Sequence, residues 1–254
     1  MKKYLIIPII FVMVFTNCSD SSEKLFDKAK KYYDNNNYKK AFKLYKKSAN
    51  QGNAIAQYNL GLMYHKGKGV SQNYKKAFKW YKKSVNQGNA DAQLNLGFIY
   101  GKGKGVLKDY KKAVKLYKKS ANQGNAIAQY NLGSMYDNGL GVSQNYKKAF
   151  KWYKKSANQG DATAQYNLGL MYHKGKGVLK SPKKAVKWLK KSANQGKAIA
   201  QLNLGEMYHY GLGVSQNKSK AKYWINKAYK NPQASSKIKK RAKNLWEKYE
   251  LWNH

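Results

Sequence analysis

The chain has 254 residues and a formal net charge of +40, with 51 Lys and Arg side chains against 11 Asp and Glu. Only one of the basic residues, Arg241, is arginine. Arginine supplies the planar fork that reads phosphates and bases, whereas lysine is a hydrated point charge. The composition therefore argues against a specific nucleic-acid reader. It favours an anionic partner of another kind.

The first 17 residues have the pattern of an export signal. Lys2 and Lys3 form a basic start, and an apolar run follows from Leu5 to Phe15. This run is too short for a membrane-spanning helix, which needs about 20 residues. We therefore expect residues 1–17 to be a signal peptide and the protein to be exported.

The single cysteine, Cys18, comes directly after this segment, so the chain cannot form an internal disulfide. Its position resembles the lipobox of bacterial lipoproteins, although Asn17 departs from the usual Gly, Ala or Ser. The resemblance implies lipid attachment at Cys18 and a membrane anchor. Because Ser19 stands where an Asp often marks inner-membrane retention, the outer membrane is the expected location. The alternative is a free thiol in a soluble periplasmic or secreted protein.

Residues 22–34 carry the first helical pattern, with Phe26, Ala29 and Tyr33 on one side. The turn Asn35-Asn36-Asn37 joins it to the next helix without a Gly-x-Gly loop. We therefore interpret residues 18–37 as a lipid-anchor linker with an N-terminal capping helix.

A 36-residue period governs the next part of the chain. Three sets of glycines recur at this spacing, namely Gly52, Gly88, Gly124, Gly160 and Gly196; Gly61, Gly97, Gly133, Gly169 and Gly205; and Gly69, Gly105, Gly141, Gly177 and Gly213. A period of 20–50 residues is typical of a solenoid, in which each unit buries its apolar face against its neighbours.

Each unit predicts two helices. The first is expected to begin at a side chain that accepts hydrogen bonds from the helix start, at Asn37, Asn73, Asp109, Asn145, Ser181 and Asn217. A glycine such as Gly88 then closes this helix. Asn53, Asn89, Asn125 and Asp161 cap the second helix in the same way. Lys197 breaks the rule, so we expect the second helix of that unit to fray at its start.

The two helices of a unit differ in character. On the first, Lys39, Lys40, Lys43, Lys46 and Lys47 fall on one arc, so this helix is amphipathic. The second reads Ala-Gln-Tyr-Asn-Leu-Gly-Leu-Met-Tyr over residues 56–64. A mid-helix glycine costs up to about 1 kcal/mol relative to alanine. Its return in every unit predicts a close helix–helix contact.

These motifs together resemble the SEL-one-like repeat of the tetratricopeptide-like proteins. The pattern is Leu-Gly, Tyr, Gly-x-Gly-Val, Asn or Asp, then Ala and Trp or Leu. The resemblance implies an all-α fold, a right-handed α-α superhelix of 36-residue helix-turn-helix repeats with first helices lining the concave face. Residues 38–229 would form five repeats and a sixth first helix. Residues 230–254 would form a C-terminal capping helix with Ile238, Leu245, Trp246 and Tyr249.

The family is dominated by non-catalytic adaptors, so we expect a protein-interaction scaffold at the cell envelope. On this model the lysine arcs form one basic concave face for acidic protein segments or an anionic envelope polymer. The candidate residues are Lys43, Lys46, Lys79, Lys82, Lys115, Lys118, Lys151, Lys154, Lys187 and Lys190. In the sixth helix Ser219, Tyr223 and Asn226 interrupt the arc. The alternative is a merely hydrated lysine face that binds no partner.

An enzyme is the alternative from another class, because cysteine-rich relatives are described as β-lactamases or penicillin binders. This chain lacks their cysteines, and its serines are repeated or terminal, whereas a nucleophile with its base would be a singular feature. His65, His173 and His209 share one repeat position, too far apart for a common zinc ion. Trp80 and its equivalents alternate with leucine, as core residues do. We therefore expect no catalytic, metal or cofactor site and no specific nucleic-acid binding.

Overall fold

The computed structural model describes residues 20–249, so the predicted signal peptide and Cys18 lie outside the described residues. Within this range the chain forms helices and no strand. They are α1 (Ser22–Asp34), α2 (Tyr38–Asn50), α3 (Ala54–Lys66), α4 (Tyr74–Asn86), α5 (Ala90–Lys102), α6 (Tyr110–Asn122), α7 (Ala126–Asn138), α8 (Tyr146–Asn158), α9 (Ala162–Lys174), α10 (Pro182–Asn194), α11 (Ala198–Tyr210), α12 (Lys218–Lys230) and α13 (Ser236–Lys248).

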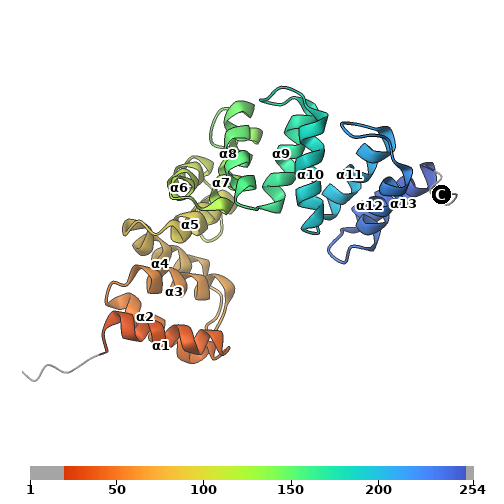
Figure 1. Cartoon of the computed structure of the whole chain (residues 1–254). Coiled ribbons are helices and arrows are strands. Elements are labelled where there is room, and N and C mark those ends of the chain that lie inside the picture. The colour runs from red at the N-terminus through yellow and green to blue at the C-terminus, as the bar shows by residue number, and fades with distance from the viewer. Residues whose placement is uncertain (1–19, 250–254) are drawn as a thin grey trace, which may run out of the picture.

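Figure 1 shows these helices stacked pair after pair along a curved, twisting path, with α1 at one end and α13 at the other. Contacts are made almost wholly between elements adjacent in sequence. The architecture confirms the predicted all-α superhelix of 36-residue repeats. We call α2, α4, α6, α8 and α10 the lysine helices, and α3, α5, α7, α9 and α11 the apolar helices.

Side-chain caps fix where the helices begin. Asn73 Oδ1 accepts a 2.8 Å hydrogen bond from the N–H of Lys76, and Asn53 Oδ1 accepts one of 2.8 Å from Ala56. Lys197 makes no such cap, as its side chain predicts. Helix α11 still begins at Ala198, and Lys197 Nζ donates to the Thr163 hydroxyl at 3.0 Å instead.

The mid-helix glycines mark the closest helix contact. A Cβ atom placed on Gly61 of α3 would lie 2.7 Å from the ring of Tyr81 in α4. The same holds for Gly97 against Tyr117 at 2.8 Å. The contact confirms the expected close approach. It joins each apolar helix to the lysine helix that follows it, so the compact pair is α3 with α4 and not α4 with α5.

The core is a series of clusters along the stack and is covered at both ends. Leu60 and Tyr64 of α3 are buried, and Trp80 of α4 packs against the same cluster. At the N-terminal end, the Phe26 ring of α1 lies 5.8 Å from that of Tyr45. At the C-terminal end, α13 covers α11 and α12 through a cluster of Leu202, Ile225, Ala228, Ala242 and Tyr249, with Ile199, Ile238, Leu245 and Trp246 packed against it.

Candidate functional site

The ten candidate lysines form one repeated surface. All of them are exposed, two on each lysine helix from α2 to α10. On α4, Lys79 lies opposite Tyr81, which packs on Gly61 of α3, and Lys82 lies at the edge of the same lysine arc. We call this the lysine surface, composed of Lys43, Lys46, Lys79, Lys82, Lys115, Lys118, Lys151, Lys154, Lys187 and Lys190. It faces away from the apolar helices.

Its position differs from the expected concave face. Consecutive apolar helices touch through side chains: Asn95 Nδ2 lies 3.5 Å from the Tyr58 hydroxyl, and the rings of His65 and Phe98 are 5.9 Å apart. Within residues 20–249, no hydrogen bond, ion pair or ring contact joins consecutive lysine helices from α2 to α10. Neighbours are closer on the inner side of a curved stack. From these contacts we infer that the apolar helices form the inner layer and that the lysine surface lies on the outer side.

The lysine surface is electrostatically uncompensated. None of its ten side chains forms an ion pair in the described part of the chain. The ion pairs there are Lys28–Asp20 at 2.8 Å, Lys112–Asp109 at 3.2 Å, Arg241–Glu206 at 2.6 Å and Lys243–Glu247 at 4.0 Å. Lysine charges repeated along a rigid stack repel one another and attract anions.

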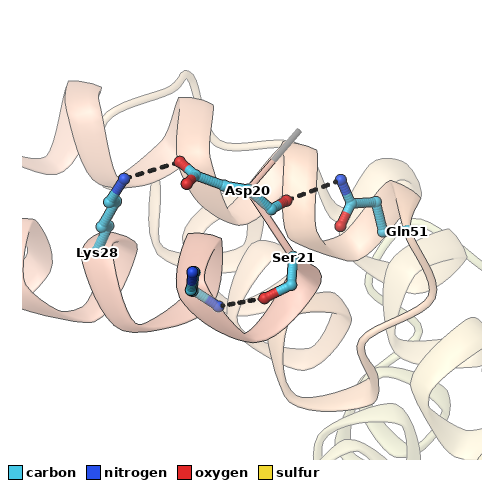
Figure 2. A network of polar contacts seen from close by, with 5 residues as sticks. Asp20, Ser21, Lys28 and Gln51 are labelled. Atoms are coloured by element: carbon cyan, nitrogen blue, oxygen red, sulfur yellow. Dashed lines mark hydrogen bonds and ion pairs between the residues drawn. The ribbon is translucent and has the colours of Figure 1, made fainter. Parts of the chain in front are cut away.

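A small polar network holds the start of the described chain against the fold (Figure 2). Lys28 Nζ donates to the Asp20 carboxylate at 2.8 Å, and this contact lowers the pKa of Asp20 below its usual range. Gln51 Nε2 donates to the Asp20 carbonyl oxygen at 3.4 Å, and Ser21 Oγ caps α1 by accepting from Lys24 N–H at 3.3 Å. Residue 20 is thus connected to both α1 and the turn after α2.

The inner layer carries a row of asparagines that the sequence analysis did not single out. They precede Leu-Gly in every apolar helix, at Asn59, Asn95, Asn131, Asn167 and Asn203. Asn95 meets the Tyr58 hydroxyl of the preceding repeat, and Asn203 interacts in the same way with Tyr166. Burial raises the pKa of Tyr166, and the hydrogen bond with Asn203 opposes that shift. The signal was the identity of this residue in all five units.

A cavity of about 420 Å³ opens near the C-terminal end, where α9, α11 and α13 meet. Arg241 Nη2 of α13 donates to Glu206 Oε2 of α11 at 2.6 Å across it. Its lining consists of Tyr166, Leu170, His173, Lys174, Leu189, Asn203, Glu206, Met207, Tyr210, Leu212 and Arg241. This site was not predicted from the sequence. The available signals were Leu189, where the preceding repeats have tyrosine, and the single arginine, Arg241.

His65, Ser84 and Ser120 interact with neighbouring groups of the fold. His65 Nδ1 lies 3.4 Å from the Tyr81 hydroxyl, and burial lowers the pKa of His65. Ser84 Oγ donates to the Ala54 carbonyl at 2.7 Å, and Ser120 Oγ to that of Ala90 at 2.8 Å. Residues 20–249 hold no group of three His, Cys, Asp or Glu side chains placed to share a metal ion. None of the helices in this range has the length and apolar character needed to cross a bilayer.

Comparison with known proteins identifies the family of these repeats. The model of the Sel1 repeat matches residues 33–53, 54–89, 90–125, 126–161, 162–197 and 198–232. Its unit begins at each apolar helix and ends after the next lysine helix, the pair that the Gly61–Tyr81 contact joins. The boundaries thus fall half a repeat away from the units defined from the sequence alone.

Two solved structures are similar over most of the chain. One is a protective antigen present in uropathogenic Escherichia coli strains, displaying an SLR fold, with 33% identity, a TM-score of 0.82, and coverage of 90% of this chain and 49% of that one. The chain therefore spans about half the length of that protein. The other is a Sel1 repeat protein from Oxalobacter formigenes, with 32% identity, a TM-score of 0.77, and coverage of 88% and 99%. A search of curated proteins found no match.

Repeat proteins of this kind generally act as scaffolds for protein interaction, because the stacked units present extended surfaces. Six consecutive matches, and two similar structures above 30% identity, cover most of the described helices. The chain belongs to the Sel1 repeat family.

Proposed function

We propose that this chain is a non-catalytic scaffold of the bacterial cell envelope, which binds the acidic surface of a partner protein along its lysine surface. The observation that carries the proposal is a row of ten exposed lysines without an ion-pair partner, repeated on five successive helices. Protein partners are the general rule for these repeats. The charge of the surface then selects acidic ones.

Many weak contacts would carry this binding. A single exposed ion pair contributes only about 0.2–1 kcal/mol and is screened by salt. A row of lysines held at a fixed spacing instead attracts a complementary row of carboxylates over a distance, which mainly raises the association rate. Binding that weakens steeply as salt rises is therefore the expected signature.

The test is crosslinking and capture from intact cells with the full-length protein and two variants. K79E/K115E reverses two charges of the lysine surface. K66E/K102E is the matched control, since it changes charge equally in the same two repeats, at exposed ends of the apolar helices. The wild type and the control should capture the same protein, and K79E/K115E should lose it.

Two results would overturn this assignment. Retention of the partner by K79E/K115E would mean that the lysine surface is only hydrated. Capture of an anionic envelope polymer in place of a protein, lost in the same variant, would assign the surface to that polymer.

The envelope location is proposed from residues 1–18, which have the pattern of a lipoprotein signal. Cys18 would carry the lipid, and the outer membrane would be its site. Outer-membrane fractionation of the wild type and Cys18→Ser, with mass spectrometry of the mature N-terminal peptide, tests this. The wild type should be acylated and sediment with the outer membrane, and the variant should not. Recovery of both proteins in the soluble fraction, without acylation, would indicate a soluble periplasmic or secreted protein.

A further inference from the structure

In three repeats, the lysine helix carries an aromatic ring that fills the space beside the inner layer. The rings are those of Tyr81, Tyr117 and Tyr153, each packed on the glycine of its apolar helix. The hydroxyl groups of two of these rings reach the end of that helix: Tyr81 lies 3.4 Å from His65 Nδ1, and Tyr153 lies 3.5 Å from Asp137 Oδ2.

His65 is enclosed by aromatic rings on two sides. The Tyr81 ring is 6.2 Å from it, and the Phe98 ring of the next apolar helix stacks on it at 5.9 Å. His173, in α9, holds the same repeat position but has neither neighbour. Leu189 stands in place of the tyrosine, and Glu206 in place of the phenylalanine.

These two replacements coincide with the cavity. Leu189 packs on Gly169 as the tyrosines do, with its Cγ 2.9 Å from where a Cβ would lie, but its side chain ends before the hydroxyl position. His173 Nδ1 is buried and makes no hydrogen bond within the described residues. Both residues line the cavity of about 420 Å³. The cavity is therefore lined by a histidine whose Nδ1 has no hydrogen-bond partner, whereas two other repeats hold a tyrosine hydroxyl near the equivalent side chain.

The next repeat has the same replacement but a different outcome. Ile225 takes the tyrosine position there, and Tyr249 of the C-terminal end stacks on His209 at 3.5 Å and 9°. An aromatic ring thus covers the equivalent histidine in that repeat also. His173 remains without one.

The rim of the cavity suits a polypeptide. Asn203 Oδ1 is buried without a hydrogen-bond partner among residues 20–249, so it can accept from a backbone N–H. Arg241 and Glu206, paired at 2.6 Å, lie beside it, and the exposed side chains of Lys174 and Tyr210 line its edge. An apolar cavity of about 150 Å³ holds a benzene ring. The larger volume here accommodates a phenol ring and the chain that carries it.

We propose that this cavity binds a tyrosine side chain of a partner polypeptide, with the phenol hydroxyl donating to His173 Nδ1 and the ring lying against Leu189. This proposal rests on the proposed scaffold function in one respect: the ring belongs to a polypeptide partner. It does not depend on the lysine surface, which lies on the opposite side of the stack.

The first test uses p-cresol as a phenol probe and toluene as the matched ring without a hydroxyl, with NMR titration of the full-length protein. p-Cresol should bind saturably and shift the His173 resonances, and toluene should bind roughly three- to tenfold more weakly, the value of one hydrogen bond. A short peptide with a central Tyr should displace p-cresol, and the same peptide with Phe should do so more weakly. No saturable p-cresol binding, or no displacement by the Tyr peptide, would overturn the proposal.

Variants then locate the site. Leu189→Tyr rebuilds the ring of the other repeats and should abolish p-cresol binding, while His173→Leu should reduce p-cresol to the level of toluene. Tyr81→Leu is the matched control in a repeat that has the tyrosine, and p-cresol binding at the cavity beside His173 should be unchanged in it. K79E/K115E should bind p-cresol like the wild type even if it loses its acidic partner, so the two proposals fail separately. Full p-cresol binding by both Leu189→Tyr and His173→Leu would overturn the assignment to this cavity.

Discussion

Gly61 and its counterparts set the distance between the two helices of each repeat. The Tyr81 ring occupies the space where a Cβ atom would stand, 2.7 Å away. A mid-helix glycine is unfavourable for the isolated helix, so the close contact is what makes it favourable in the fold. Contacts of this kind explain why a residue that weakens a helix returns in every unit.

Gly61→Ala is expected to destabilise the protein by about 1–3 kcal/mol, because the added methyl group overpacks the contact with Tyr81. Gly101→Ala is the matched control in another apolar helix, where the nearest neighbour of the new Cβ is 3.7 Å away. That change should stabilise the protein by up to about 1 kcal/mol through helix propensity. Urea unfolding of both variants measures the opposite signs. A stabilising Gly61→Ala would contradict the packing argument.

The cavity could not be predicted from single residues of the sequence. Leu189, Glu206 and Arg241 come from three different helices, α10, α11 and α13, so the sequence does not show that they lie together. Leu189 also preserves the apolar character of its position, so it does not disturb the periodic pattern. Only the packed structure shows that Leu189 and Glu206 line the same cavity as His173.

The helices depend on their ends and on their neighbours. Each is 13 residues long, a length at which an isolated helix is only marginally stable in water. Side-chain caps therefore matter, and Asp161 provides one for α9 by accepting a 2.6 Å hydrogen bond from Ala164 N–H. Helix α11 lacks this cap because Lys197 stands at the equivalent position.

Lys197→Asp should supply the missing cap and stabilise the protein by about 1 kcal/mol, less whatever the contact with the Thr163 hydroxyl contributes. Asp161→Ala should remove an existing cap and cost about the same. Hydrogen exchange at the first turn of α11 gives a local measurement. Unchanged protection there in Lys197→Asp would contradict the expected fraying of this helix in the wild type.

At the scale of the whole molecule, stability is distributed among neighbouring units, since nearly all contacts join elements adjacent in sequence. Deleting residues 126–161, one full repeat, should therefore shorten the stack without unfolding it. Circular dichroism should show an unchanged helical signal per residue with a lower melting temperature. Loss of the helical signal would contradict the nearest-neighbour description.

The net charge of +40 acts on the whole molecule as well. Raising NaCl from about 50 mM to about 500 mM should raise the melting temperature, because salt screens repulsion between like charges. K79E/K115E should show a smaller rise, since it removes part of that repulsion. A melting temperature that falls equally in both proteins would contradict the picture of an uncompensated lysine surface.

The sequence predicted the repeat length, the helix starts and the close contact at the mid-helix glycines. It could not decide which helices pair, because a periodic pattern has a spacing but no starting point. The concave placement of the lysines followed from beginning the unit at Asn73. The contact of Gly61 with Tyr81 decides the pairing, and the contacts between consecutive apolar helices indicate the side on which the lysines lie.

The network around Asp20 bears on the distance between a lipid on Cys18 and the solenoid. Asp20 is bound to α1 and to the turn after α2, and Cys18 is only two residues away. Two residues extend over about 7 Å at most, so a lipid on Cys18 would be joined to the solenoid by a very short linker. The α1 end would then sit at the bilayer surface while the cavity beside α13 lies at the far end of the stack (Figure 1). The number of repeats, and not a flexible linker, would set how far from the membrane a captured tyrosine is held.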